Sequence, residues 1–356
     1  MDSTAQRPSP LRVAAVVSFY MFAALVMVFV NKTVLNSTPD APLLFLFFQL
    51  VIAVILLHVS ALFSSRIEIP HWDRSTAKNL VPVVTINIVG LVFNTLCLRE
   101  VEASFFQIAR GLVLPLTITV SSLASHSHPA SRVVIAAGVV TTGFFIGVAP
   151  EGSLPISSIP STKSLFYGVF SSLSIAIHTV LIKSSLPYCN NSTIQLAYWT
   201  NAGSAVLLAP FVLLHGEPAK ILELSTSSDW NMKVFIWGSL VTGLFGFLLC
   251  VAGLLSIKVT SPVTHMFSSA ARSVIQTLLG VWLFHDILTT NRVVSLMAIL
   301  GGTMYYTWVK AKEQSQSQPP ARPIDLEALN HAKDDKDEMN GFDAREKATG
   351  PDSDSD

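Results

Sequence analysis

The sequence predicts an all-α membrane protein whose ten transmembrane helices form two inverted five-helix repeats. Three observations predict this fold: an apolar composition, ten apolar runs of membrane-spanning length, and a pattern that recurs in both halves. Hydrophobic residues make up 51% of the 356 residues and charged residues only 13%, about half the charged share of a soluble domain. Eighteen of the 46 charged side chains lie in residues 311–356, which leaves 28 for the first 310 residues. A surface so poor in charge must face lipid.

The predicted spans follow from the length of the apolar runs, because a bilayer core requires about 20 apolar residues per helix. Polar connections separate the runs, and the pairs Arg99-Glu100 and Ser261-Pro262 argue against merging neighbours into nine spans. The first run is too long for the core of a signal peptide, so we expect it to be retained. The ten spans are 11–32, 42–63, 80–98, 103–124, 132–149, 165–186, 194–214, 233–256, 261–284 and 293–310.

The two halves share a sequence pattern. The fourth span contains Phe-x-x-x-Ala-Arg ending at Arg110, and the ninth contains the same pattern ending at Arg272. The spans that follow each open with Arg-Val-Val, at Arg132 and at Arg292, so the two offsets, 162 and 160 residues, are almost equal. Five spans per half force the second copy to enter the membrane in the opposite sense. Inverted repeats are typical of transporters that bind substrate near the membrane midplane.

The distribution of basic residues predicts the orientation. Lys and Arg in and next to the connections number ten on one side of the membrane and six on the other, and the richer side is expected to be cytosolic. Both termini then lie in the cytosol. The tail is acidic and poor in apolar residues, so we expect it to be disordered. The predicted order is a cytosolic N-terminal segment, the first repeat, a lumenal linker, the second repeat and the disordered acidic tail, at 1–10, 11–149, 150–164, 165–312 and 313–356.

Two arginines lie deep within predicted spans, and no carboxylate does. Arg110 and Arg272 each cost about 2.5–3.5 kcal/mol to insert at a helix centre, whereas all 23 acidic residues lie in connections, at helix ends or in the tail. Either backbone carbonyls or a bound anion must therefore satisfy the guanidinium groups. Their planar fork matches phosphate oxygens, so we predict that the pair binds a phosphorylated anion such as a diphosphate. Proton coupling usually requires an intramembrane carboxylate, which is missing.

Other polar side chains inside the spans are candidates for binding the part of such a ligand that is not phosphate. Asn94, Gln107, Asn201 and His265 lie within predicted helices, although each could instead form a helix–helix hydrogen bond. Tyr198 could stack on a base, or could be one of the aromatic residues common at membrane interfaces.

Several other classes of protein are disfavoured. A net charge of zero, with an acidic tail, argues against a nucleic-acid surface. The three cysteines have neither metal nor disulfide spacing, so we expect no metal and no cofactor. Membrane transferases need paired carboxylates, which the spans lack, so no catalytic residue is predicted. A channel would require a continuous polar stripe or a ring of charge.

Several segments resemble the nucleotide-sugar transporters of the drug/metabolite transporter superfamily, and within it the Golgi GDP-fucose transporters. The resemblance covers about residues 11–312 and implies a drug/metabolite transporter fold. It also implies exchange of a cytosolic nucleotide sugar, GDP-fucose, for a lumenal nucleoside monophosphate, GMP, and it adds Lys32 to the substrate-binding residues. The segments that carry the resemblance are Met27–Lys32, Phe93–Leu98, Arg110–Leu112, Gly243–Phe247, Ile257–His265, Gln276–Thr277 and Tyr306–Val309.

Two segments differ from the family pattern. GDP-sugar carriers have Phe-Tyr-Asn-Asn where this chain has Tyr198-Trp199-Thr200-Asn201, and they have lysine where it has Arg272. These differences leave open a UDP-sugar such as UDP-galactofuranose. A triose-phosphate-type exchanger, which shares the fold and the basic site, is a further alternative. The predicted partners are the two exchanged nucleotides and the Golgi bilayer, and the oligomeric state is left open between a monomer and a homodimer.

Overall fold

The computed structural model describes residues 10–64, 67–149, 160–227, 230–259 and 262–317, with side chains in these ranges except at 10–14, 250–270, 314, 315 and 317. The chain divides into two units, Met1–Val309 and Lys310–Asp356. Within its described residues, the first unit contains eleven helices and a 3-10 turn, and a twelfth helix begins in it. The elements are α1 (Pro10–Ser37), α2 (Pro42–Phe63), α3 (Arg74–Glu100), α4 (Phe105–Ala109), α5 (Val113–Ser125), α6 (Ser131–Val148), α7 (Thr162–Ser185), η2 (Leu186–Cys189), α8 (Thr193–Leu214), α9 (Glu217–Thr226), α10 (Met232–Val259), α11 (Pro262–Phe284) and α12 (Thr290–Ser317).

The predicted all-helical membrane protein is confirmed at this level. The described ranges contain helices and no β-strand, and eight of the helical segments are long and apolar enough to cross a membrane. The arrangement as ten spans in two inverted repeats stays a prediction.

Polar residues mark where several helices begin. The carboxylate of Asp73 accepts hydrogen bonds from the backbone N–H groups of Ser75 and Thr76 at the start of α3, and Ser161 and Ser192 accept equivalent bonds at α7 and α8. Such caps satisfy N–H groups that lack a partner within the helix. Hydrogen bonds from the Thr76 hydroxyl and from these N–H groups hold the pKa of Asp73 below its ordinary value.

The fourth predicted span, 103–124, is not one continuous helix. It breaks into α4 and α5 at Arg110, whose φ of −94° and ψ of 2° end the first segment. Pro115 lies in the first turn of α5, and because it has no N–H group, it cannot donate to the carbonyl of Gly111. Pro115 was therefore a visible signal in the sequence for a break that the prediction of one continuous span did not include. The break places the Arg110 side chain at a helix end and not on a helix face.

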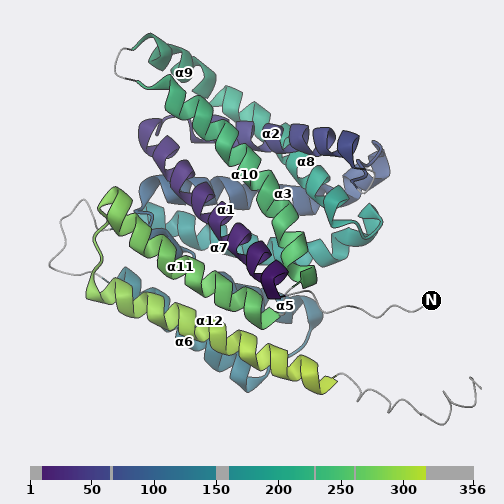
Figure 1. Cartoon of the computed structure of the whole chain (residues 1–356), viewed down its shortest axis with the longest axis vertical. Helices are drawn as coiled ribbons and strands as arrows, with labels where there is room; N and C mark the ends of the chain where they lie inside the picture. Colours follow the sequence, from purple (N-terminus) through teal and green to yellow (C-terminus); the bar gives the residue numbers. More distant parts are fainter. Residues whose placement is uncertain (1–9, 65–66, 150–159, 228–229, 260–261, 318–356) are drawn as a thin grey trace, which may run out of the picture. The chain divides into compact units, whose positions relative to one another are not determined.

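Close helix packing surrounds this break. α3 packs along α7 and α1 packs along α10 (Figure 1). Gly168 on α7 lies against α4, where an added Cβ would be 2.9 Å from the Ala109 carbonyl oxygen and 3.0 Å from its Cβ. The absence of a side chain at Gly168 therefore lets α7 approach the residue just before Arg110.

We expect Gly168→Ala to lower the free energy of unfolding by about 1–3 kcal/mol, because the new methyl group overpacks a contact with backbone. Gly138→Ala is the matched control, since an added Cβ there meets nothing within 4 Å. The control should be neutral or stabilising by up to about 1 kcal/mol, as is usual for glycine in a helix interior. Thermal unfolding in detergent measures both, and equal midpoints would contradict the packing argument.

Buried charged groups join the helices at one end of the bundle. Lys32 at the end of α1 donates to the carbonyls of Leu98, Arg99 and Val101, at 3.0, 3.2 and 2.6 Å. The carboxylate of Asp286 accepts from the Ser104 N–H at 2.7 Å. Arg292, only 2% exposed, forms an ion pair with Glu102. We call Lys32, Glu102, Asp286 and Arg292 the capping cluster.

Candidate functional site

The two predicted arginines lie half-buried on different helices and close enough to interact electrostatically. Arg110 follows α4 and its guanidinium lies 5.3 Å from the ring centroid of Phe106. Arg272 lies on α11, and its charge acts on Arg110. Two like charges held together in this way repel each other, so the arrangement favours an anion between them.

Neither arginine is neutralised by the described part of the protein. The Nε atoms of Arg110 and Arg272 are both buried without a hydrogen-bond partner, and no described carboxylate lies within ion-pair distance of either. The sequence also allowed backbone carbonyls to accept hydrogen bonds from the guanidinium groups. No described carbonyl does so at either Nε. A buried charged donor without a partner is costly, which favours an external ligand.

A pair of glutamines links the two helices that carry the arginines. Gln107 Nε2 donates to Gln276 Oε1 at 2.6 Å, and Gln276 Nε2 donates to the Ala103 carbonyl at 3.1 Å. Gln107 lies one turn before Arg110, and Gln276, 1% exposed, lies one turn after Arg272. This glutamine bridge sets the position of α11 against α4, and with it the spacing of the arginines.

The glutamine bridge is testable by a double-mutant cycle on Gln107→Leu and Gln276→Leu. Each single change leaves the other amide, buried at Gln276 and half-buried at Gln107, without its partner, so each should lower the free energy of unfolding by about 1–3 kcal/mol. The double variant should lose about 1 kcal/mol less than the sum of the two. Chemical denaturation in detergent measures this coupling energy, and strict additivity would show that the amides act independently.

Two further helices border the arginines. Cys97 on α3 and Tyr20 on α1 both lie in the neighbourhood of Arg110, which brings these helices to the same region. Asn94 lies one turn before Cys97, and its Oδ1 is buried without a hydrogen-bond partner. Polar atoms lacking partners on α3, at the end of α4 and on α11 thus mark one site, which we call the arginine site.

Comparison with known protein families matches residues 11–307 to the Triose-phosphate Transporter family. The chain belongs to this family. It is 30% identical to "GDP-fucose transporter 1" of Nematostella vectensis, over 90% of this chain and 95% of the relative. It is also 30% identical to the mouse protein of the same name, over 86% of both chains. An uncharacterized transporter of Schizosaccharomyces pombe is 33% identical over 88% of this chain and 79% of the relative.

Asn201 lies at a separate cavity of this triose-phosphate transporter family member. That cavity, of about 190 Å³, is also lined by Met27, Gln49 and Thr242, so α1, α2, α8 and α10 contribute to it. Asn201 Nδ2 donates to the carbonyl of Ala197 in its own helix at 2.8 Å, which leaves its Oδ1 available to a ligand.

Three other predicted residues form no described contact with either arginine, although Lys32, like Arg110, lies in the neighbourhood of Cys97. Lys32 engages three backbone carbonyls in the capping cluster. Tyr198 packs its ring edge-to-face on His58 at 5.3 Å. His265 lies in the part of α11 whose side chains are outside the described residues.

Gln276 and Tyr20 were not among the predicted site residues. Gln276 could have been found, because a buried amide one helical turn from a buried arginine is a visible signal in the sequence. Tyr20 could not have been found, since only the tertiary packing brings α1 to the end of α4.

Proposed function

We propose that this chain is a nucleotide-sugar transporter of the Golgi membrane that exchanges cytosolic GDP-fucose for lumenal GMP. The observation that carries the proposal is the arginine site, with two half-buried guanidinium groups whose Nε atoms lack a hydrogen-bond partner among the described residues. A diphosphate bridging Arg110 and Arg272 would supply acceptors for both forks and would relieve their repulsion. The names of the GDP-fucose transporter relatives support the choice of sugar and base, and the Drosophila melanogaster relative is named as a Golgi protein.

Exchange is favoured over proton coupling by where the acidic residues lie. Glu102, Glu217 and Asp286 are buried or half-buried, but each lies at a helix end and accepts a hydrogen bond or an ion pair there. No carboxylate is therefore available in mid-membrane to carry a proton in the described part of the chain. The arginine site carries a fixed positive charge, so the change from opening on one side of the membrane to opening on the other is easiest when an anion occupies it. Uptake of one anion is then coupled to export of another.

Liposome exchange tests the proposal. The purified protein is reconstituted with GMP, UMP, AMP or CMP trapped inside, and uptake of labelled GDP-fucose, UDP-galactofuranose and a triose phosphate is measured. We expect GDP-fucose uptake that is strong with trapped GMP and small in empty liposomes. Equal uptake with and without trapped nucleotide would contradict exchange. Uptake of UDP-galactofuranose that depends on trapped UMP would show that the substrate is a UDP-sugar and not GDP-fucose. Exchange of triose phosphate would show that the protein is a triose-phosphate-type exchanger.

The proposed orientation has both termini in the cytosol. Protease added to sealed Golgi vesicles is expected to remove a C-terminal tag and the tail after Lys312, while the helical unit ending at Val309 stays intact. Immunoblotting with one antibody against the tag and one against the helical unit measures the loss of the tail and the survival of that unit. A tag that stays protected until detergent is added would reverse the orientation.

A further inference from the structure

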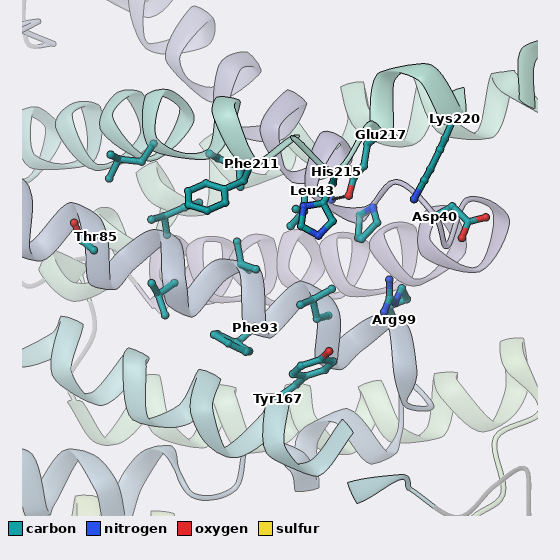
Figure 2. Close-up of a pocket in the computed structure, with 17 residues that line it drawn as sticks. Asp40, Leu43, Thr85, Phe93, Arg99, Tyr167, Phe211, His215, Glu217 and Lys220 are labelled. Atoms are coloured by element: carbon teal, nitrogen blue, oxygen red, sulfur yellow. Dashed lines mark hydrogen bonds between the residues drawn. The ribbon is translucent and has the colours of Figure 1, made fainter. Parts of the chain in front are cut away.

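A cavity of about 600 Å³ is lined by none of the eight predicted site residues. It lies between α3, α7 and α8, and Phe93, Tyr167 and Phe211 line it from these three helices (Figure 2). α7 and α8 are joined through η2 and both pack on α3, so α3 lies between them along the cavity. We call this cavity the lateral groove.

The lateral groove opens on the apolar outside of the protein. Phe211 is 56% exposed and Leu207 is 39% exposed, and both lie on α8, one of the helices able to cross a membrane. In a bilayer such exposed apolar side chains contact acyl chains. The walls offer few polar groups along α3 and α8, so a nucleotide would be poorly matched there, whereas a hydrocarbon chain would be well matched.

One end of the lateral groove is charged. Arg99 ends α3, Lys220 lies on α9 and Asp40 precedes α2. Figure 2 shows the Lys220 and Arg99 side chains pointing toward the same space from opposite sides, with Asp40 next to it. The groove therefore combines an apolar length with a charged end at the helix termini, which is the arrangement of a phospholipid at a membrane interface.

Some of the charged side chains at this end already bind other groups of the protein. Glu217 accepts hydrogen bonds from the backbone N–H groups of Leu43 and Leu44, so its carboxylate is committed to the start of α2. Arg99 is partly engaged, by Glu100 and by the Pro39 carbonyl.

Two opposite charges are left for a ligand. The side chains of Lys220 and Asp40 are exposed and form no ion pair or hydrogen bond within the described ranges. They offer a cation and an anion on the two sides of one opening, with Arg99 close to both.

We propose that the lateral groove binds a phospholipid with a zwitterionic, primary-ammonium headgroup, as in phosphatidylethanolamine. Its phosphate lies between Lys220 and Arg99, its ammonium group donates to Asp40, and one acyl chain runs along Phe93 and Phe211. This lipid site is separate from the arginine site and does not depend on which anion the protein carries.

Native mass spectrometry of the purified full chain tests the headgroup contacts. It is titrated with palmitoyl-oleoyl phosphatidylethanolamine, with phosphatidylglycerol and with the diacylglycerol of the same chains. Lys220→Glu should weaken phosphatidylethanolamine binding by about five- to thirtyfold. The control Lys233→Glu, an exposed lysine outside the groove, should change it less than twofold. Asp40→Asn should weaken phosphatidylethanolamine binding but not phosphatidylglycerol binding, because only the former has an ammonium group.

The apolar wall is tested by filling it. Leu207→Trp should abolish retention of phosphatidylethanolamine, whereas Leu213→Trp, a matched change outside the groove on the same helix, should leave it intact. Equal binding of diacylglycerol and phosphatidylethanolamine to the unchanged protein would overturn the proposal, as would equal losses in Lys220→Glu and Lys233→Glu. Circular dichroism and a monodisperse elution profile establish that each variant is folded, so a loss of binding reports on the groove.

Discussion

Replacing Arg110 or Arg272 by alanine is expected to lower the affinity for GDP-fucose roughly ten- to hundredfold. Each change removes a charge-assisted hydrogen bond worth about 1.5–3 kcal/mol. The unfolding midpoint should not fall, because neither guanidinium is held by a described carboxylate and each Nε lacks a hydrogen-bond partner. Calorimetric titration of purified, monodisperse protein measures the affinity, and thermal unfolding of the same samples measures stability.

Lysine variants and an exposed arginine give the controls. Arg272→Lys should recover more affinity than Arg110→Lys, because the resemblance to GDP-sugar carriers implies a lysine at the position of Arg272 and a point charge still attracts phosphate there. Arg132→Ala, at the exposed start of α6, should bind normally. Loss of stability with unchanged affinity in the Arg110 and Arg272 variants would show that both residues are structural.

Replacing Lys32 by methionine is expected to lower the free energy of unfolding by about 3–5 kcal/mol. The change removes three hydrogen bonds to buried carbonyls at the end of α3. It also leaves the capping cluster with an excess of negative charge, since Asp286 and Glu102 both interact electrostatically with Lys32. Removing one partner of a buried charge pair typically costs this much. The thermal midpoint in detergent is the measurement.

Affinity distinguishes this structural role of Lys32 from the substrate-binding role that the family resemblance implies. Lys32→Arg should restore part of the stability, because guanidinium also donates to carbonyls. Lys310→Met provides the control, as the Lys310 side chain is 46% exposed and pairs with the similarly exposed Glu313 three residues away. A Lys32→Met protein of normal stability but weakened GDP-fucose binding would support direct contact with substrate.

Composition and patterning were sufficient to predict the helices. Ten apolar runs follow from the requirement that a membrane-spanning backbone satisfy its own hydrogen bonds in lipid, and long helices cover nine of these runs while α4 and α5 cover the tenth. The importance of Arg110 and Arg272 was also visible, because a charge within an apolar run is costly wherever the run folds. Their proximity was suggested by the repeated pattern and agrees with their electrostatic interaction.

The role of Lys32 and the limits of the arginine site could not be predicted in this way. From the sequence, Lys32 and Arg110 are both cations at or within an apolar span. Among the described residues, however, the Lys32 side chain donates to backbone carbonyls and the Arg110 side chain does not, because α3 ends beside Lys32. Likewise Gln107 and Gln276 are 169 residues apart, and no local pattern joins them.

The sequence by itself determined that this chain is a helical membrane protein and which of its charges are buried in the spans. These properties depend on local hydropathy, which each residue carries wherever it is placed. Only the tertiary structure decided which of these cations the described part of the protein satisfies, as it does Lys32, and which keep an Nε without a hydrogen-bond partner, as Arg110 and Arg272 do. That outcome depends on where helix ends from distant parts of the chain meet, since a carbonyl that has lost its helical partner can accept from lysine only within about 3 Å.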